Sequence, residues 1–463
     1  MIQGSDETPR SPAARSPRWS SQIAVYLGTA GASVGLGSLW RFPYLAGTGG
    51  GSAFILVFFL SCLLIATPLL VAELAIGRRS RASPPQAAGI AVGSGGRSRW
   101  NAIGILGTLA AYLIFSYYTL IAGWVLAYTW KCANGMLAAA GPQHVSALWQ
   151  SFRANPLETG AWHAVFVLVT LTISSRGLQK GIEPANRIRA PGLLLLLVVL
   201  VIYSWSTGDI HRAFAFAFAP RFSDLNAQIA LAAVGQAFYA TGVGQAMMIA
   251  FGAYIDRGTS LIRVAFMITA AILLVSLLAT VMIFPLVFGY GMNPAQGPEL
   301  VFEVLPRVFT EMPGGRLIGT LFFALLVLAA LTPSIALLEP AVYWLMQRRG
   351  MSRAVATWIV GLSAWILGVG SVLSFSSWAD WHPLGALRPF AQKTFFDLVD
   401  YSSSNILLPV GALLTSLLTG WRAREVLQHE LAGTSSWVRK GCTWLLRYVC
   451  PIAILVLFIA ALS

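Results

Sequence analysis

The chain has 463 residues, of which 57% are hydrophobic and only 10% carry charge. This composition excludes an ordinary soluble domain, in which about 25% of the residues are charged. The formal net charge of +14 at pH 7 would suit a nucleic-acid-binding protein, but the Lys and Arg residues lie between long apolar blocks rather than in one cluster. We therefore expect a membrane protein and no nucleic-acid partner.

Apolar blocks of about 18 to 25 residues, each long enough to cross a hydrocarbon layer of ~30 Å, follow one another along the whole chain. They predict an all-α polytopic membrane protein with about 11 transmembrane helices. The blocks lie at 22–45, 53–77, 101–130, 161–176, 190–207, 225–254, 260–289, 315–346, 354–374, 394–420 and 441–462.

Residues 1–18 precede the first block and are rich in Pro, Ser and Arg. We expect a disordered cytoplasmic tail there rather than a cleaved signal peptide, because no cleavage-like site follows a short apolar core. Basic residues crowd one short connection, at Arg78, Arg79, Arg81, Arg97 and Arg99. The positive-inside rule places this connection and the N-terminus in the cytoplasm, and eleven spans of the inner (plasma) membrane then place the C-terminus outside.

The sequence carries no pattern of an enzyme or a metal site. Its four cysteines form no CxxC pair, and its five histidines lack the spacing of metal ligands. Neither a GxGxxG sequence after a strand nor a Walker pattern occurs. We therefore expect no catalytic residues and no organic cofactor, and we look for function in the membrane-embedded helices.

Two of the blocks contain residues that weaken a membrane helix. The first holds GASVGLGSLWRFP at 31–43, and the sixth holds GQAFYATGVGQA at 235–246. Unwinding a helix in lipid leaves backbone groups unsatisfied unless they line a cavity that holds a ligand. Freed amides favour an anionic group and freed carbonyls favour a cation. The alternative interpretation is glycine used for close helix packing.

The two interruptions occupy corresponding positions in two five-helix halves, which favours a ligand site in an inverted-repeat transporter. We predict a first repeat at 19–208, a second at 222–421 and an additional eleventh helix at 440–463. The interruptions are expected near 33–37 and 239–244, facing each other at mid-depth in the membrane.

Motifs along the chain resemble those of the neurotransmitter:sodium symporter family. They are SVGLGSLWRFPYLAGTGGGSAF, ELAIGR, YYTLIAGW, SSRGLQKGIEPANRIRAP, GQAFYATG, LAALTPSIALLEP and FFDLVDYSSSNILLP, in order over roughly residues 19 to 420. The resemblance is to the bacterial amino-acid transporter branch, and it implies the leucine-transporter-like fold and alternating access. The alternative is a non-transporting membrane sensor or scaffold that retains the fold. Monomer and homodimer both stay open.

The resemblance also implies a substrate site. Backbone amides at Leu36 and Gly37 and the hydroxyl of Tyr118 would meet a substrate carboxylate, with Gly35 leaving room for it. Tyr239 would cover the site. The side-chain pocket would be lined by Ile114, Gly242, Gln245 and Leu337. Gln245 replaces the family's usual phenylalanine, which argues against a purely aliphatic substrate.

Gates on both sides of the site carry over by the same resemblance. The outer gate would be Arg41 and Asp400, with Gln236 beside them. An arginine within a membrane span is costly and therefore suggests function, although snorkelling toward the interface is the alternative. On the inner side Trp19 and Tyr254 are kept.

The family's ion sites are eroded in this chain. At the first sodium site Ser38, Ala240 and Ile272 stand where the family has oxygen-bearing Asn, Thr and Asn side chains, and an isoleucine offers a hard cation no ligand. The anion site is also incomplete, since Phe58 replaces a tyrosine. We expect no sodium at the first site.

The second sodium site is partly kept. Its ligands would be the carbonyls of Gly31, Val34 and Ala329 and the hydroxyl of Thr332, but the next position is Pro333, which has no hydroxyl. Arg189 stands where relatives usually have an apolar residue. Its guanidinium could replace the second sodium, as basic residues do in some sodium-independent transporters of this fold. The alternative is one more orienting arginine at the lipid headgroups.

Overall fold

The structure is a computed structural model that describes residues 18–94, 98–219, 223, 225–295 and 299–462. Within these ranges the chain is built of helices and turns, without strands, which agrees with the predicted all-α fold. The predicted disordered tail at 1–18 lies outside the described residues except for its last residue.

The first half of the chain supplies five long membrane-crossing units and several short connecting helices. Their bounds are α1 Gln22–Ser33, η1 Gly37–Arg41, α2 Phe42–Thr48, α3 Ser52–Ser61, η2 Cys62–Ala66, α4 Thr67–Ser80, α5 Pro84–Ala91, η3 Arg99–Asn101, α6 Ala102–Ala133, α7 Met136–Ala140, α8 Val145–Ala154, α9 Pro156–Ser175, η4 Leu178–Ile182, α10 Glu183–Thr207 and α11 Ile210–Phe218. Side-chain caps mark several starts, as where Asn155 accepts from the first amides of α9.

The second half repeats this alternation of long helices and short connections. Its elements are α12 Ala227–Thr241, α13 Met247–Ala253, α14 Leu261–Gly289, η6 Leu300–Val304, α15 Leu305–Glu311, α16 Gly315–Arg349, α17 Arg353–Leu373, η7 Arg388–Phe390, α18 Phe395–Tyr401, η8 Ser402–Leu407, α19 Leu408–Leu417, η9 Leu418–Arg422, α20 Arg424–Glu430, α21 Ser436–Trp444, η10 Leu445–Val449 and α22 Cys450–Leu462. Of the η segments, η3 and η7 are 3₁₀ turns and the others named here are π-helical turns.

In the described part of the chain, nine helical segments are long and apolar enough to cross a membrane, or ten if the bent pair α1 and α2 forms one span. Ten of the eleven predicted blocks correspond to these segments. The sixth block, 225–254, is divided into α12 and α13, which are each too short to be counted. The predicted count of eleven is therefore not established by helix length alone.

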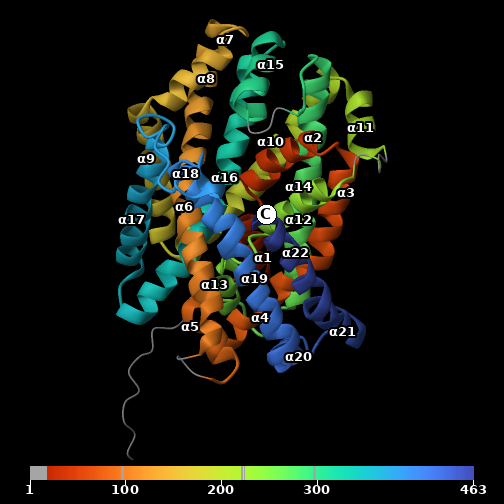
Figure 1. Cartoon of the computed structure of the whole chain (residues 1–463), viewed down its shortest axis with the longest axis vertical. Coiled ribbons are helices and arrows are strands. Elements are labelled where there is room, and N and C mark those ends of the chain that lie inside the picture. Colours follow the sequence, from red (N-terminus) through yellow and green to blue (C-terminus); the bar gives the residue numbers. More distant parts are fainter. Residues whose placement is uncertain (1–17, 95–97, 220–222, 224, 296–298, 463) are drawn as a thin grey trace, which may run out of the picture.

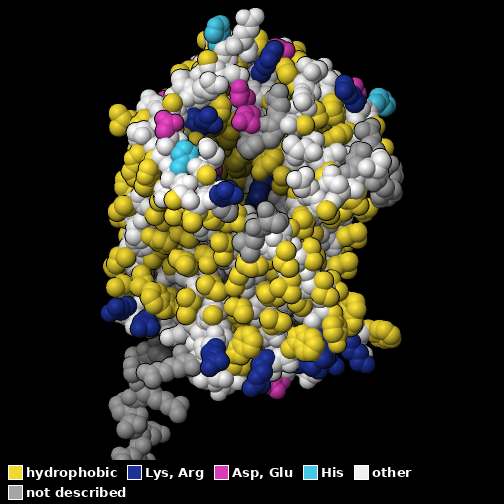
Figure 2. Space-filling view, viewed as in Figure 1, with side chains coloured by type: hydrophobic (Ala, Val, Ile, Leu, Met, Phe, Trp, Pro, Cys, Tyr) yellow, Lys and Arg dark blue, Asp and Glu magenta, His cyan; other side chains and the backbone are white. Residues whose placement is uncertain are grey.

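The helices stand roughly parallel to the long axis of the molecule (Figure 1). In this view α6, α9 and α17 form the left side, α3 and α14 lie on the right, and α1, α12 and α13 lie nearer the middle. On the face seen in Figure 2, a wide belt of hydrophobic side chains lies above a band of Lys and Arg at the lower end. Such a belt with basic residues at one end is typical of a membrane protein that follows the positive-inside rule.

Candidate functional site

The first helix is broken where its sequence predicts. α1 ends at Ser33, Val34 and Gly35 leave the helix, and Leu36 leads into the π-helical turn η1 and then α2, with a bend of 51° between α1 and the segment that follows the break. The predicted interruption at 33–37 thus coincides with the observed one. The amides and carbonyls freed here must be satisfied within the protein or by a ligand.

The sixth block is broken slightly later than predicted. Residues 239–241 are still helical, and the interruption begins at Gly242 and extends to Ala246. Gly242, Gly244 and Ala246 all have positive φ angles, of 71°, 84° and 55°. Glycine adopts this left-handed region readily, so the break starts at the first glycine that can leave the helix rather than at Tyr239.

The two breaks lie against each other. The Ser33 hydroxyl donates to the Thr241 carbonyl (3.2 Å), and the Gln236 amide donates to the Gly37 carbonyl (2.7 Å). A carboxylate that sequence reasoning overlooked holds the second break: Glu73 of α4 accepts from the Gly244 amide at 2.7 Å and is 1% exposed. The sequence did indicate this residue, because Glu73 is an acid within the apolar block at 53–77, and acids in membrane spans are costly and therefore suggest function.

A small cavity of about 30 Å³ lies between the two breaks. All nine residues that the resemblance assigns to the substrate site line it: Gly35, Leu36, Gly37, Ile114, Tyr118, Tyr239, Gly242, Gln245 and Leu337. Met247 and Pro333 complete the wall around the expected side-chain pocket. The structure therefore brings together residues from four separate helices at one place, although their roles stay predictions.

The hydroxyl of Tyr118 is the polar group that projects toward the break in α1. It is buried and lies close to the Leu36 backbone amide, without a well-formed hydrogen bond to any protein group. An ideal Cβ atom built on Gly35 would lie 3.0 Å from this hydroxyl and 2.6 Å from Cγ of Pro333. Only a residue without a side chain fits at position 35, and a buried donor remains available for a ligand.

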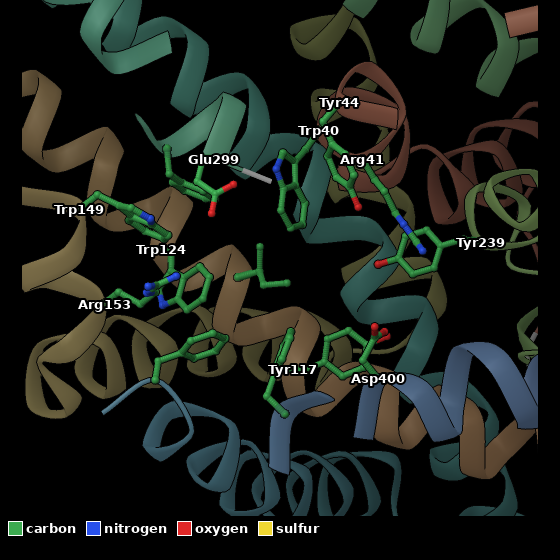
Figure 3. A pocket seen from close by; sticks show the side chains of 14 residues that line it. Trp40, Arg41, Tyr44, Tyr117, Trp124, Trp149, Arg153, Tyr239, Glu299 and Asp400 are labelled. Atoms are coloured by element: carbon green, nitrogen blue, oxygen red, sulfur yellow. The ribbon is translucent and has the colours of Figure 1, made fainter. Parts of the chain in front are cut away.

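A larger vestibule of about 280 Å³ lies on the other side of Tyr239 (Figure 3). The Arg41 guanidinium stacks over the Tyr239 ring, 4.2 Å from its centroid, while Asp400 accepts from Ser404 at 3.0 Å. In Figure 3 Arg41 lies over the Tyr239 ring and Asp400 lies below it. The hollow in the upper half of Figure 2 lies between α2 and α18, which border this vestibule.

The opposite side of the cavity is closed. The Trp19 ring covers Gly28 and packs edge-on against Phe251, with centroids 5.5 Å apart. Tyr254 donates to Glu339 at 2.7 Å. Gln347, where the family usually has an aspartate, accepts from the Ser83 amide at 2.7 Å.

A buried ion pair that sequence reasoning did not identify also closes this side. Arg353 of α17 donates to both carboxylate oxygens of Glu339 at 2.8 and 2.6 Å, and Glu339 is 0% exposed. The sequence feature that could have indicated this pair is Glu339, an acid inside the apolar block at 315–346. The cavity is therefore closed on this side, while the vestibule lies on the other side of Tyr239.

Arg189 lies inside the protein rather than at its surface. Only 4% of the residue is exposed, and its guanidinium approaches the Val34 carbonyl at 3.5 Å and the Leu328 carbonyl at 3.4 Å. A Cβ built on Gly31 would lie 2.6 Å from Nη2 of Arg189. This burial contradicts the alternative of an orienting arginine among lipid headgroups.

Two further side chains complete this cluster. Thr332, a predicted ligand of the second sodium site, donates to Asn186 at 2.8 Å. Asn186 lies one turn before Arg189 in α10 and is 2% exposed. The cation position that Gly31, Val34 and Thr332 would surround therefore has a guanidinium beside it.

A bundle of apolar helices in which two broken helices meet at a small buried cavity is typical of secondary transporters. The model of the sodium:neurotransmitter symporter family matches residues 16–151 and 158–379. The chain belongs to this family. Its relatives are transporters rather than enzymes.

Similar proteins cover nearly the whole chain. The uncharacterized sodium-dependent transporter YhdH of Bacillus subtilis is 36% identical over 446 residues, which are 96% of this chain and 97% of that protein. An uncharacterized sodium-dependent transporter of Haemophilus influenzae is 31% identical over 454 residues, covering 96% and 98%. Among solved structures, MhsT in complex with L-phenylalanine superposes with a TM-score of 0.87 at 35% identity and covers 96% of this chain and 99% of MhsT.

Proposed function

We propose that the protein transports amino acids, or closely related molecules that carry a carboxylate, by alternating access. The observation that carries the proposal is the unpartnered Tyr118 hydroxyl beside the freed backbone amides of Leu36 and Gly37. Hydroxyl and amide donors at the start of a half-helix are the groups that an anionic carboxylate requires. The solved relative MhsT binds L-phenylalanine, an amino acid of this class.

The side-chain end of the cavity suggests a substrate that is not purely aliphatic. Gln245 brings a carboxamide to a pocket whose other walls include Ile114, Met247 and Leu337. A pocket that contains a polar side chain favours ligands that form a hydrogen bond with that side chain. An analogue without a hydrogen-bonding group leaves the polar side chain desolvated and unpaired. We therefore expect a side chain with at least one hydrogen-bonding group to bind more tightly than an aliphatic one of similar size.

We propose further that transport does not depend on a sodium gradient. The first sodium site lacks three oxygen ligands in this chain, at Ser38, Ala240 and Ile272. At the second site the Arg189 guanidinium approaches the Val34 carbonyl, one of the expected ligands, at 3.5 Å and lies beside Gly31. A fixed positive charge there stabilises the break in α1 and also repels a cation. Exchange or proton coupling would then drive transport.

The test uses the purified protein in detergent and in proteoliposomes. A panel of amino acids is screened by calorimetry and by uptake, at constant ionic strength, with sodium or with potassium. We expect binding of at least one amino acid in potassium, and no binding of the corresponding amine that lacks the carboxylate. Binding without any uptake or exchange would instead indicate the sensor or scaffold alternative.

Arg189→Ala separates the two parts of the proposal. If the guanidinium replaces the ion, this variant binds substrate about tenfold or more weakly in potassium, the effect of losing a charge-assisted interaction, and sodium restores part of the affinity. Arg187→Ala removes an exposed arginine of the same helix and serves as the matched control. A steep sodium dependence in the unmodified protein would refute sodium independence while leaving the amino-acid proposal intact.

A further inference from the structure

The Lys- and Arg-rich end of the molecule carries a cluster of aromatic and basic side chains that the transport site does not use. It is formed where η9 packs against η10, with hydrogen bonds from Ser416 and Trp421 to the carbonyls of Leu446 and Arg447. We call it the Arg447 cluster. It consists of Trp421, Arg422, Trp444, Arg447 and Tyr448.

The guanidinium at its centre is held by rings and not by an acid. Its Cζ atom lies 4.1 Å from the centroid of the Trp421 ring and 5.2 Å from that of Tyr448. Nε of Arg447 is buried and has no hydrogen-bond partner. Cation–π contacts position an arginine without using its N–H donors; because Nε is covered, an anion would be bound by the terminal Nη groups of this half-buried side chain.

The backbone under the cluster is firmly anchored. A π-helical turn leaves carbonyls without their α-helical partners. Here the Ser416 hydroxyl donates to the Leu446 carbonyl at 2.6 Å, and the Trp421 indole donates to the Arg447 carbonyl at 2.9 Å. Arg447 is therefore placed by two helices together, and its position does not depend on a mobile loop.

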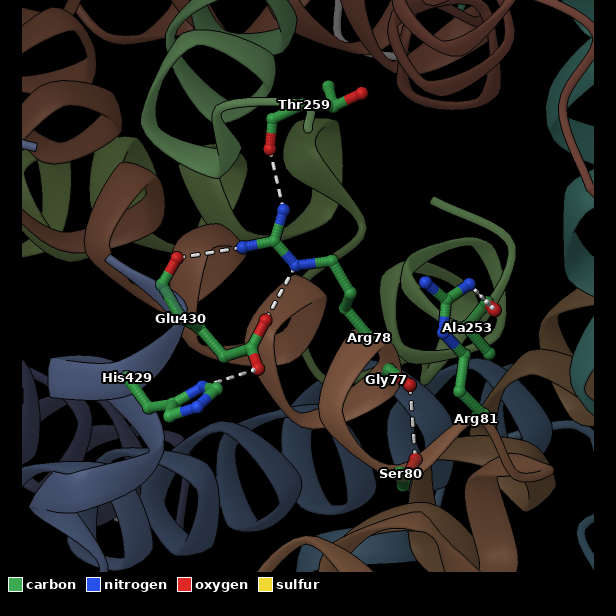
Figure 4. Close-up of polar contacts among 8 residues, drawn as sticks. All are labelled: Gly77, Arg78, Ser80, Arg81, Ala253, Thr259, His429 and Glu430. Atoms are coloured by element: carbon green, nitrogen blue, oxygen red, sulfur yellow. Dashed lines mark hydrogen bonds and ion pairs between the residues drawn. The ribbon is translucent and has the colours of Figure 1, made fainter. Parts of the chain in front are cut away.

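The acids of the neighbouring segment do not neutralise the cluster. Glu430 is committed to Arg78, which donates to its carboxylate at 2.6 Å and to its backbone carbonyl at 2.7 Å (Figure 4). Glu425 is exposed in the first turn of α20. The nearby α21 adds Arg439 and Lys440, so basic groups are in excess.

The aromatic side chains place this cluster at a membrane boundary. Trp437, Trp444 and Trp421 are 85, 56 and 47% exposed, as expected for rings that lie among lipid headgroups rather than in a packed core. Figure 2 shows Lys and Arg gathered at this same lower end of the molecule. An anion held here at headgroup depth is most directly a phospholipid phosphate.

We propose that the Arg447 cluster is a binding site for the phosphate of an anionic phospholipid in the cytoplasmic leaflet. The Arg447 guanidinium donates to the phosphate oxygens, Arg422 adds charge from the exposed side, and Trp421 and Trp444 contact the glycerol and upper acyl region. A zwitterionic lipid binds less well because its choline group meets the same basic surface.

The test is native mass spectrometry of the detergent-purified full chain with phosphatidylglycerol or phosphatidylcholine of identical acyl chains. We expect the unmodified protein to retain phosphatidylglycerol preferentially. Arg447→Gln should bind it about tenfold more weakly, as expected for losing hydrogen bonds to a charged group. Arg349→Gln removes another exposed basic residue of this end and should leave binding unchanged.

If Arg447→Gln does not fold, Arg422→Gln replaces an exposed side chain, and it should weaken phosphatidylglycerol binding about fivefold, the effect of one basic charge near the surface. Equal retention of both lipids by the unmodified protein would overturn the proposal, as would unchanged binding in both variants. Displacement of the lipid by inorganic phosphate at equal concentration would show a free-anion site and would also overturn it.

Discussion

Replacing Tyr118 by phenylalanine removes one oxygen from the cavity between the two broken helices and changes little else. The hydroxyl has no well-formed hydrogen bond with the protein, so its loss should change the stability of the ligand-free protein little. If it binds the substrate carboxylate, the variant loses one hydrogen bond to a charged group, which is worth about 1.5–3 kcal/mol. The dissociation constant should rise about 10- to 150-fold.

The assay is isothermal titration of the amino acid that the panel identifies, with the melting temperature of the ligand-free protein measured in parallel. The melting temperature of Tyr118→Phe should not fall. Tyr128→Phe is the matched control, because Tyr128 lies on the same helix, is buried, and also has an unpartnered hydroxyl, but it packs against Trp149 and Phe152 outside the cavity. Unchanged affinity in Tyr118→Phe would refute the assignment of the carboxylate site.

Two other substitutions test separate parts of the structure. Gly35→Asp should abolish measurable amino-acid binding. Its Cβ would lie 2.6 Å from Cγ of Pro333, and its charge would face the substrate carboxylate in a poorly hydrated cavity. If calorimetry showed binding at the affinity of the unmodified protein, the substrate would have to bind elsewhere. Glu430→Gln should lower the free energy of unfolding by about 3 kcal/mol, because it leaves Arg78 buried without its acid. A thermal melt compares it with Glu425→Gln at an exposed acid, and equal melting temperatures for the two variants would contradict a structural role for the pair.

Much of the architecture was predictable from sequence because its causes are local. Apolar blocks of membrane-crossing length, interrupted by glycines, predicted the helices and the two breaks. The nine substrate-site residues were expected from the family resemblance alone, and all nine are among the residues that line the cavity. These features depend on short stretches of chain and on the thickness of a bilayer.

Other features could be decided only by the tertiary structure. Helical residues persist to Thr241 and the second break extends to Ala246, because backbone angles near glycines depend on packing and on the Glu73 carboxylate. From the sequence, the Arg189 guanidinium could lie either among lipid headgroups or near the second cation position. The structure shows that its side chain runs into the protein, toward the Val34 carbonyl.

The buried ion pairs give the clearest contrast. Arg78 and Glu430 are separated by 352 positions, and nothing in either local sequence indicates the other. Glu339 and Arg353 are closer in sequence, yet they meet only because α16 and α17 pack as neighbours. Which side chains meet depends on how whole helices are placed in the bundle, and that placement results from all of their packing contacts together. The existence of each helix, by contrast, depends on the composition of its own segment.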